Sequence, residues 1–158
     1  MKLYLIRHAH AGSRSAWDGD DTRRPLSARG EGQARAIAAQ LADAGIDLLW
    51  TSSYLRCRQT LEPLADHLGL EIADSVAFTE GGAGPVALDA ALEAAADGRT
   101  LAVCSHGDVL PAVAAAAVRR GADIEGGQAL KKAARYDCTV EGGQLIRLVA
   151  VGPPDGTT

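Results

Sequence analysis

The chain has 158 residues, of which 47% are hydrophobic and only 4% are aromatic, and its formal net charge at pH 7 is -4. A length of this order predicts one globular domain, which we assign to residues 1–151, with a flexible tail at 152–158. The acidic balance argues against nucleic acid or an anionic membrane as a partner, because both require a basic surplus.

The apolar runs of the chain are all shorter than the about 20 residues that cross a bilayer. The apolar stretch at the start of the sequence is also too short for a signal peptide and soon meets charged residues. We therefore expect a cytoplasmic protein. The three cysteines are few and unevenly spaced, which is typical neither of a disulfide framework nor of a zinc site.

The first predicted elements are a strand, a loop, a helix and a second strand. Residues 2–7 form a short apolar run that predicts a buried strand. The polar stretch 9–25 predicts a long loop, and loops of that length in compact domains are usually functional. Ser27 is a candidate N-cap for a helix that Gly45 ends, and the apolar run 46–52 predicts the next strand.

The middle of the chain continues this alternation. Leucines at helical spacing predict a helix over residues 55–68, which Pro63 is expected to kink or split. Residues 70–74 predict a weak strand, residues 85–96 an alanine-rich helix and residues 100–105 a strongly apolar strand.

The last third of the sequence predicts a helix, a loop and a hairpin. Residues 109–119 have helical periodicity, residues 122–132 are interpreted as a loop, and two apolar segments at 134–141 and 144–151 flank Gly142-Gly143. Strands that alternate with helices predict an α/β three-layer sandwich, with helices on both faces of a mostly parallel sheet. The hairpin is expected to add an antiparallel C-terminal edge.

Three polar motifs follow three of the predicted strands directly. Arg7 and His8 follow the first strand, residues 52–56 (SSYLR) follow the second, and residues 105–107 (SHG) follow the strongly apolar strand late in the chain. In an open parallel α/β sheet, ligands bind beyond the carboxyl ends of the strands. The sequence therefore predicts that these three motifs meet at one edge of the sheet.

The residue types in these motifs suit a phosphoryl group. Arg7 and Arg56 offer planar, forked donors that match phosphoryl oxygens. One imidazole can attack phosphorus and be phosphorylated, which gives a two-step hydrolysis, while the other donates a hydrogen bond to the phosphoryl oxygens. Nearby guanidinium charge keeps the attacking ring neutral, because it lowers the pKa below the usual value of about 6.5.

Other residues are candidates for accompanying roles. Glu80 is the best-placed candidate for protonating the leaving group, although a solvated loop carboxylate is the alternative interpretation. Arg24, beside the long loop, is a candidate for substrate binding, and Lys131-Lys132 is interpreted first as a solvated pair. Weaker candidates for the proton donor are Asp18, Asp20 and Asp21.

A metal site is an alternative interpretation of the first motif. His8 and His10 form an H-x-H pair, which also occurs in metal hydrolases, and His106 with Asp108 or Asp20 would complete the ligand set. Two nearby arginines would repel a cation, so we expect no metal and no cofactor. The other alternative is a phosphate-recognising module with weak catalysis.

The segments LIRHAHAG, TSSYLRCRQT and CSHGD resemble the signature segments of the histidine phosphatase (phosphoglycerate-mutase-like) superfamily. The small size resembles the SixA-type phosphohistidine phosphatases. The WDGDD and RPLS segments and the PLA run after TSSYLRCRQT are also similar to the histidine-phosphatase-like domain of some Nudix hydrolases. The resemblance extends from residue 1 to about residue 149.

The resemblance implies a role for each matching residue. His8 matches the nucleophile that becomes phosphohistidine, and Arg7, Arg56 and His106 match the rest of the phosphate pocket. Glu80 falls where many members keep a general acid, whereas SixA-type members often lack a clear one. The implied function is a metal-independent phosphatase, and the implied substrate is a phosphorylated small molecule or a phosphohistidine-bearing protein.

Overall fold

The computed structural model describes residues 2–154, so Met1 and residues 155–158 of the predicted tail lie outside the described residues. The strands are β1 (Lys2–Arg7), β2 (Leu48–Thr51), β3 (Ile72–Asp74), β4 (Leu101–Ser105), β5 (Asp123–Glu125), β6 (Arg135–Glu141) and β7 (Gln144–Val151). The helices are α1 (Ala28–Leu41), α2 (Leu55–Leu68), α3 (Gly84–Ala94) and α4 (Val109–Arg119), and the short 3-10 turns are η1 (Arg14–Ala16), η2 (Asp21–Arg23) and η3 (Val76–Phe78). The assignment of residues 1–151 to one domain stays a prediction.

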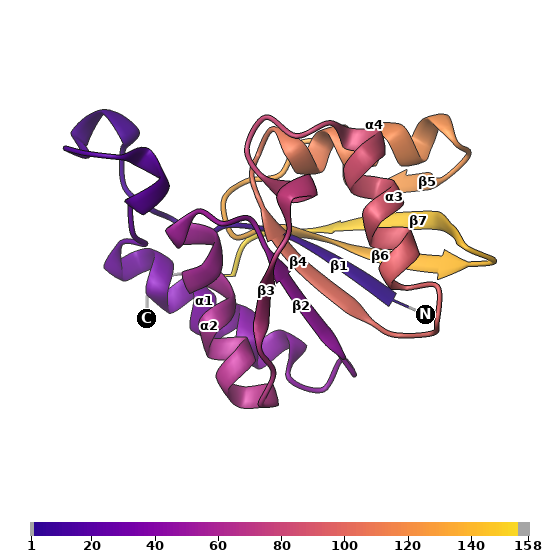
Figure 1. Ribbon diagram of the computed structural model, residues 1–158, viewed down its shortest axis with the longest axis horizontal. Helices are drawn as coiled ribbons and strands as arrows, with labels where there is room; N and C mark the ends of the chain where they lie inside the picture. The colour runs from indigo at the N-terminus through magenta and orange to yellow at the C-terminus, as the bar shows by residue number, and fades with distance from the viewer. Residues whose placement is uncertain (1, 155–158) are drawn as a thin grey trace.

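The seven strands form one mixed sheet in the order β3-β2-β4-β1-β6-β7-β5 (Figure 1). Strands β3, β2, β4 and β1 are parallel to one another, whereas β6 pairs antiparallel with both β1 and β7. The predicted α/β class, with its antiparallel C-terminal part, is confirmed. The prediction of a loop throughout residues 122–132 was wrong, because β5 pairs in parallel with β7 as the outermost strand. Three residues are too few to show the alternation that identifies a strand.

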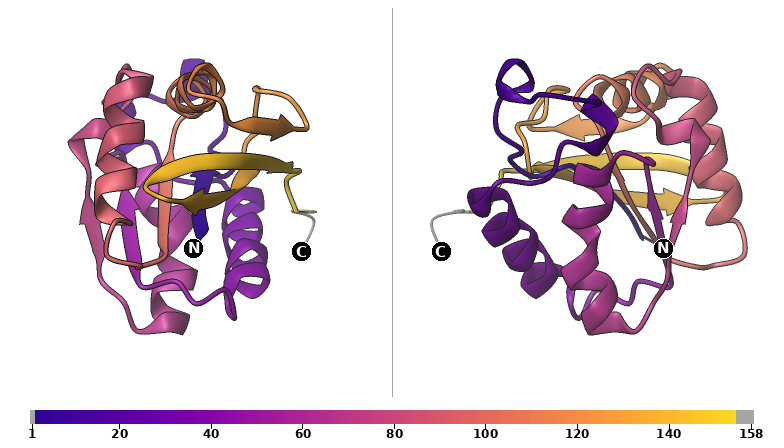
Figure 2. Two further views of the ribbon diagram at one scale, coloured as in Figure 1. Left: turned by 90° about the vertical axis from the view of Figure 1, so that its right-hand side faces the viewer. Right: turned by 60° about the vertical axis from the view of Figure 1, so that its left-hand side comes forward.

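Helices cover both faces of this sheet, which gives three layers. Helices α1 and α2 lie on one face, and α3 and α4 lie on the other (Figure 2). Alternate residues of β1 divide between the two cores, with Leu3 and Leu5 packed toward α3 and α4 and Tyr4 and Ile6 toward α1 and α2. A Cβ atom on Gly84 would come within 2.2 Å of a carbonyl oxygen of α4, so this glycine permits the close crossing of α3 and α4.

The helix ends follow the predicted signals, with one difference at Pro63. The hydroxyl of Ser27 accepts a hydrogen bond from the amide of Gly30 at 3.1 Å and caps α1 as predicted. Helix α2 was expected to kink or split at Pro63; it does not split, and one helix runs from Leu55 to Leu68. The side chains of Leu61 and Leu64 are fully buried on either side of Pro63, and we attribute the continuity of the helix to this packing.

The sheet order brings the three polar motifs together. Strand β4 lies between β2 and β1 and is parallel to both, so the three strands end at the same edge. Arg7 is the partner of Ser105 in the register of β1 and β4. Backbone pairing continues beyond the strand ends, because the amides of His8 and Ser52 donate to the carbonyls of Ser105 and Cys104, both at 3.0 Å. The motifs therefore start from a rigid platform.

Candidate active site

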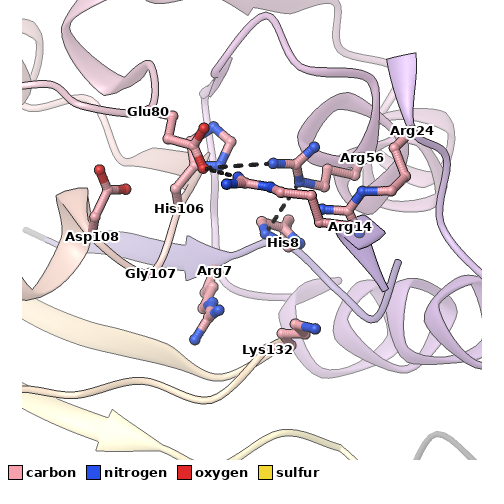
Figure 3. A pocket seen from close by; sticks show the side chains of 10 residues that line it. All are labelled: Arg7, His8, Arg14, Arg24, Arg56, Glu80, His106, Gly107, Asp108 and Lys132. Carbon is pink, nitrogen blue, oxygen red and sulfur yellow. Dashed lines mark hydrogen bonds and ion pairs between the residues drawn. The ribbon is translucent and has the colours of Figure 1, made fainter. Parts of the chain in front are cut away.

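A pocket of about 290 Å³ lies beyond the carboxyl ends of β1 and β4 (Figure 3). Five of its lining side chains are cationic and two are carboxylates, although the whole chain is acidic. The lining residues are Arg7, His8, Arg14, Arg24, Arg56, Glu80, His106, Gly107, Asp108 and Lys132. A concave surface with this balance of charge attracts anions.

His8 is buried at the floor of this pocket and is neutral. Its Nδ1 lies 2.9 Å from the carbonyl oxygen of Ala9, an acceptor that requires the proton to reside on Nδ1. Nε2 is therefore unprotonated, and it accepts a long contact of 3.4 Å from Nε of Arg56. Burial, followed by the positive charges of neighbouring side chains, lowers the pKa of His8 to about 3. The ring thus presents the unprotonated Nε2 to the pocket at neutral pH, with only this long contact from Arg56 on its lone pair.

Arg56 is almost completely buried, with 1% of its side chain exposed. It follows Leu55 at the start of α2, and its guanidinium donates to the backbone oxygen of Asp21 at 2.8 Å and to the carboxylate of Asp21 at 3.2 Å. The guanidinium also lies over the ring of Tyr54, with Cζ 4.9 Å from the ring centre. These contacts hold a permanent positive charge beside His8.

His106 is the second imidazole of the pocket, and its ring centre lies 5.6 Å from that of His8. Nε2 of His106 lies 2.8 Å from Oγ of Ser52, and Tyr54 packs edge-on against the ring at 4.7 Å. Nδ1 of His106 is buried and has no hydrogen-bond partner among the described residues. A buried polar atom without a partner is costly, and an anion oxygen in the pocket would satisfy it.

Arg7 lies on the side of His8 away from Arg56, and its side chain passes close to Gly107. Its Nη1 donates to the carbonyl of Leu130 at 2.6 Å, whereas its buried Nε has no partner among residues 2–154. A Cβ atom on Gly107 would come within 2.5 Å of the guanidinium carbon of Arg7. The glycine of the SHG motif therefore makes room for this arginine.

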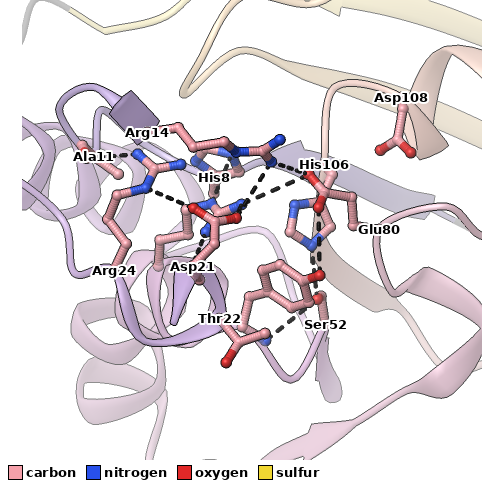
Figure 4. A network of polar contacts seen from close by, with 12 residues as sticks. His8, Ala11, Arg14, Asp21, Thr22, Arg24, Ser52, Glu80, His106 and Asp108 are labelled. Carbon is pink, nitrogen blue, oxygen red and sulfur yellow. Dashed lines mark hydrogen bonds and ion pairs between the residues drawn. The ribbon is translucent and has the colours of Figure 1, made fainter. Parts of the chain in front are cut away.

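Asp21 binds three arginines, and Figure 4 shows it between Arg14 and Arg24. Its carboxylate binds Arg24 at 3.0 Å, Arg56 at 3.2 Å and Arg14 at 3.3 Å. Although burial raises its pKa, the bonds to these guanidiniums outweigh that effect and lower the pKa below the ordinary range. Asp21 is therefore ionised at neutral pH, which argues against the interpretation of this residue as a proton donor.

Glu80 lies on the pocket rim, where two side chains hold it. One carboxylate oxygen accepts from Arg14 at 2.9 Å and lies 3.7 Å from Arg56, and the other accepts from the hydroxyl of Tyr54 at 3.3 Å. Asp20, a weaker candidate for the same role, instead accepts from the amide of Thr22 and caps a 3-10 turn. Glu80 therefore lines the same pocket as the two imidazoles, and Asp20 does not.

The sequence did not reveal the importance of several residues in or beside the pocket. Arg14 belongs to the loop that was predicted to be functional, but nothing in the sequence distinguishes it from its neighbours. Lys132 was interpreted as solvated, yet it lines the pocket. Ser52 and Tyr54 were recognised only as letters of the SSYLR motif, whereas the structure shows both against His106.

Arg24 and His10 are bound by other parts of the protein. Arg24 lines the pocket, but its Nε donates to the carboxylate of Asp21 and its Nη1 donates to the carbonyl of Ala11 at 2.7 Å. Because these N–H groups are bonded to the protein, Arg24 has fewer donors left for a substrate. The ring of His10 lies 2.6 Å from the hydroxyl of Ser27. In residues 2–154, no group of three or more His, Cys, Asp and Glu side chains is arranged to hold a metal ion. The metal alternative thus has no assembled ligand set in this region.

The sequence also predicted that the cysteines form no disulfide framework and that no segment crosses a membrane. All three cysteines are free and buried. No helix in the described part of the chain combines the length and the apolar character needed to cross a membrane.

The sequence of this chain is similar to those of known proteins. The family model of the histidine phosphatase superfamily (branch 1) matches residues 3–87. The 8-oxo-(d)GTP phosphatase of Mycolicibacterium smegmatis is 32% identical over 156 residues, which cover 97% of this chain and 48% of that protein. The chain spans about half the length of this relative, and less of the other curated relatives that it matches.

Solved structures show the same fold. The protein histidine phosphatase SixA complexed with tungstate superposes with a TM-score of 0.76 at 22% identity, and the match covers 92% of both chains. The putative phosphohistidine phosphatase SixA from Agrobacterium tumefaciens has a TM-score of 0.73 at 22% identity over 96% of this chain and 98% of that one. At this level of identity the likeness concerns the fold alone.

Proposed function

The chain belongs to the histidine phosphatase superfamily, and on that premise we propose that it hydrolyses a phosphomonoester or a phosphohistidine through a covalent intermediate on His8. The proposed nucleophile is Nε2 of His8. Arg7, Arg56 and His106 bind the phosphoryl oxygens, and Glu80 handles the proton of the leaving group. The proposed reaction needs no metal and no cofactor.

The protonation state of His8 is the observation that carries this proposal. The bond from Nδ1 to the carbonyl of Ala9 directs the lone pair to Nε2, and burial keeps the ring uncharged. A nucleophile must have a free lone pair, and this histidine has one without the help of a general base. Its neighbours in the pocket are cations, which neutralise the charge of a phosphoryl group.

The first step transfers the phosphoryl group to the protein. The lone pair on Nε2 forms a bond to phosphorus, and the bond from phosphorus to the leaving oxygen breaks. The equatorial oxygens then gain hydrogen bonds from Nδ1 of His106 and Nε of Arg7, the two buried groups that lack partners within residues 2–154. The leaving oxygen receives a proton from the carboxyl group of Glu80.

The second step regenerates the imidazole. A water oxygen forms a bond to phosphorus, the bond between phosphorus and Nε2 breaks, and the electron pair returns to Nε2. The carboxylate of Glu80 accepts the proton that the water loses, and orthophosphate leaves. In both steps the donors already lie on rigid strand ends, so little reorganisation is required.

A phosphate-recognising module with weak catalysis is the second candidate, and the contacts of Glu80 favour it. Both carboxylate oxygens of Glu80 are engaged by Arg14 or Tyr54. Glu80 must leave these partners in order to serve a leaving group. The module would bind the anion with the same cations but would form no covalent intermediate.

The names of related proteins support two substrate classes. The mycobacterial relative is an 8-oxo-(d)GTP phosphatase, which suggests a phosphorylated small molecule. The proteins that share the fold include a protein histidine phosphatase, which suggests phosphohistidine on a partner protein. We include both classes in the proposal.

Trapping the intermediate tests the proposed function. The protein is mixed with a ³²P-labelled aryl phosphate and quenched in base, in which nitrogen–phosphorus bonds persist. We expect label on the wild-type protein and none on His8→Ala, whose turnover falls by about 10⁴-fold or more. EDTA should leave turnover unchanged. A phosphate-binding protein without label would favour the module, and loss of activity in EDTA that zinc or manganese restores would favour the metal alternative.

A further inference from the structure

A second hollow, of about 340 Å³, adjoins the pocket that contains His8 and His106 on the side of Arg7. We call the pocket of His8 and His106 the phosphate pocket, because the proposed function places the phosphoryl group there. The lining residues of the second hollow are Arg7, His10, Arg29, Gln33, Lys131, Lys132 and Pro153, and we call it the basic groove. Arg7 and Lys132 line both the phosphate pocket and the basic groove. In the view of Figure 3 these two side chains lie on the side of His8 away from Arg56. The two hollows are therefore neighbours that share two cationic side chains.

The charge of the basic groove is of one sign. Four of its described lining residues are cations, and none of them is a carboxylate. Within the described chain, none of these four cations (Arg7, Arg29, Lys131 and Lys132) has a carboxylate within 4.0 Å. By contrast, each of the three cations on the other side of the pocket has an ion-pair partner; these are Arg14, Arg24 and Arg56. An acidic chain thus concentrates unpaired positive charge beside its phosphate pocket.

Positive charges from both hollows act on Lys132 and His10. Burial, followed by the positive charges of Arg7, Arg24 and Arg56, lowers the pKa of Lys132. Burial and the charges of Lys132 and two arginines likewise lower the pKa of His10. Like charges held together raise the free energy of the folded state, and a bound anion removes that penalty. The groove is therefore arranged to receive an anion.

We propose that the basic groove is a second anion subsite, which binds a further phosphoryl group of the same substrate whose first phosphoryl group lies against His8. This inference rests on the proposed function and narrows it. Arg7 and Lys132 bridge the two groups, and Arg29 and Lys131 contact only the second. The favoured substrate is then a small molecule with two or more phosphoryl groups, because a phosphomonoester or phosphohistidine with one phosphoryl group leaves the basic groove unused.

Equilibrium binding of phosphonates tests the second subsite. Isothermal titration calorimetry at low ionic strength compares methylphosphonate with methylenediphosphonate and 1,3-propylenediphosphonate. We expect at least one diphosphonate to bind the wild-type protein about tenfold or more tightly than methylphosphonate, because charged hydrogen bonds to a second phosphonate are added. The double variant Arg29→Gln/Lys131→Gln should lose most of that advantage and retain its affinity for methylphosphonate.

The control is Arg119→Gln, which removes an exposed cation at the far end of α4 that forms no ion pair with residues 2–154. It should bind every probe like the wild type. The inference is overturned if neither diphosphonate binds more tightly than methylphosphonate, if the double variant keeps the advantage, or if Arg119→Gln loses it equally. Because both Arg29 and Lys131 are exposed, we expect the double variant to fold normally.

This test is independent of turnover. If His8 takes up label but the diphosphonates show no advantage, the second subsite fails and the proposed function stands. If the diphosphonates bind as expected but no labelled His8 forms, the phosphatase mechanism fails, and the groove remains an anion subsite of a binding module.

Discussion

The hydroxyl oxygen of Ser52 lies 2.8 Å from Nε2 of His106, which links a residue that follows β2 to one that follows β4. With one ring nitrogen engaged in this way, the other, Nδ1, faces the phosphate pocket without a partner among the described residues. Ser52 does not itself line the pocket. It is therefore a positioning residue, which fixes the orientation of the His106 ring.

Replacing Ser52 with alanine tests this role. We expect kcat for p-nitrophenyl phosphate to fall about fivefold, since the loss of one hydrogen bond of about 1 kcal/mol lets the ring of His106 rotate. KM should change less, because Arg7 and Arg56 still bind the phosphoryl group. The control is Ser53→Ala, which alters the exposed neighbour and should leave both constants unchanged. Equal activity of the two variants would contradict the positioning role.

Replacing Glu80 with glutamine tests the proton donor through the leaving group. We expect about a 100-fold fall in kcat for glycerol 2-phosphate, whose alkoxide needs a proton, and a much smaller fall for p-nitrophenyl phosphate, whose phenolate leaves without one. Asp108→Asn alters the other carboxylate of the pocket, which accepts from the amide of Gly81, and should show no dependence on the leaving group. An equal fall for both substrates in Glu80→Gln would exclude Glu80 as the donor.

The close contact of Gly107 with Arg7 predicts the effect of adding one methyl group. In Gly107→Ala the new Cβ atom displaces the guanidinium of Arg7, because the two would otherwise be 2.5 Å apart. We expect kcat/KM to fall about 10-fold to 100-fold, the cost of one charged hydrogen-bonding contact to phosphate. Gly152→Ala is the control, since its Cβ atom meets nothing within 4 Å. Wild-type kinetics in Gly107→Ala would show that Arg7 is not required where it lies.

The buried, neutral His8 predicts a loss of stability in acid. Its pKa is about 3 in the folded protein and about 6.5 in the unfolded chain, so the unfolded state binds the proton first as the pH falls below 6.5. Between about pH 7 and pH 4.5, the free energy of unfolding should fall by about 2–3 kcal/mol more in the wild type than in His8→Gln. Urea unfolding at the two pH values measures this difference. Parallel changes in the two proteins would mean that His8 is not buried in its neutral form.

That the three motifs meet at one edge of the sheet could be predicted from the sequence, because their positions follow from one rule of sheet architecture. The apolar runs before Arg7, Ser52 and Ser105 identified buried strands, and parallel strands end at a common edge. The short strand β5 and the continuity of α2 through Pro63 could not be predicted in this way. The first depends on pairing with β7, and the second depends on packing against the sheet and α1.

The amino-acid sequence was sufficient to identify the residue types of the pocket and their order along the chain, since apolar periodicity and the adjacent polar motifs are local properties. The tautomer of His8, the salt bridges of Asp21 and the unpaired charges of the basic groove were decided only in three dimensions. The salt bridge from Asp21 to Arg56 and the grouping of the groove cations depend on distances between segments that lie far apart in the chain. The tautomer of His8 depends on the local backbone geometry that places Nδ1 beside the carbonyl of Ala9. Electrostatic and hydrogen-bond energies change steeply with such distances. Residues as ordinary as Arg14, Arg29 and Lys132 thus acquire their significance from what the folded chain places beside them.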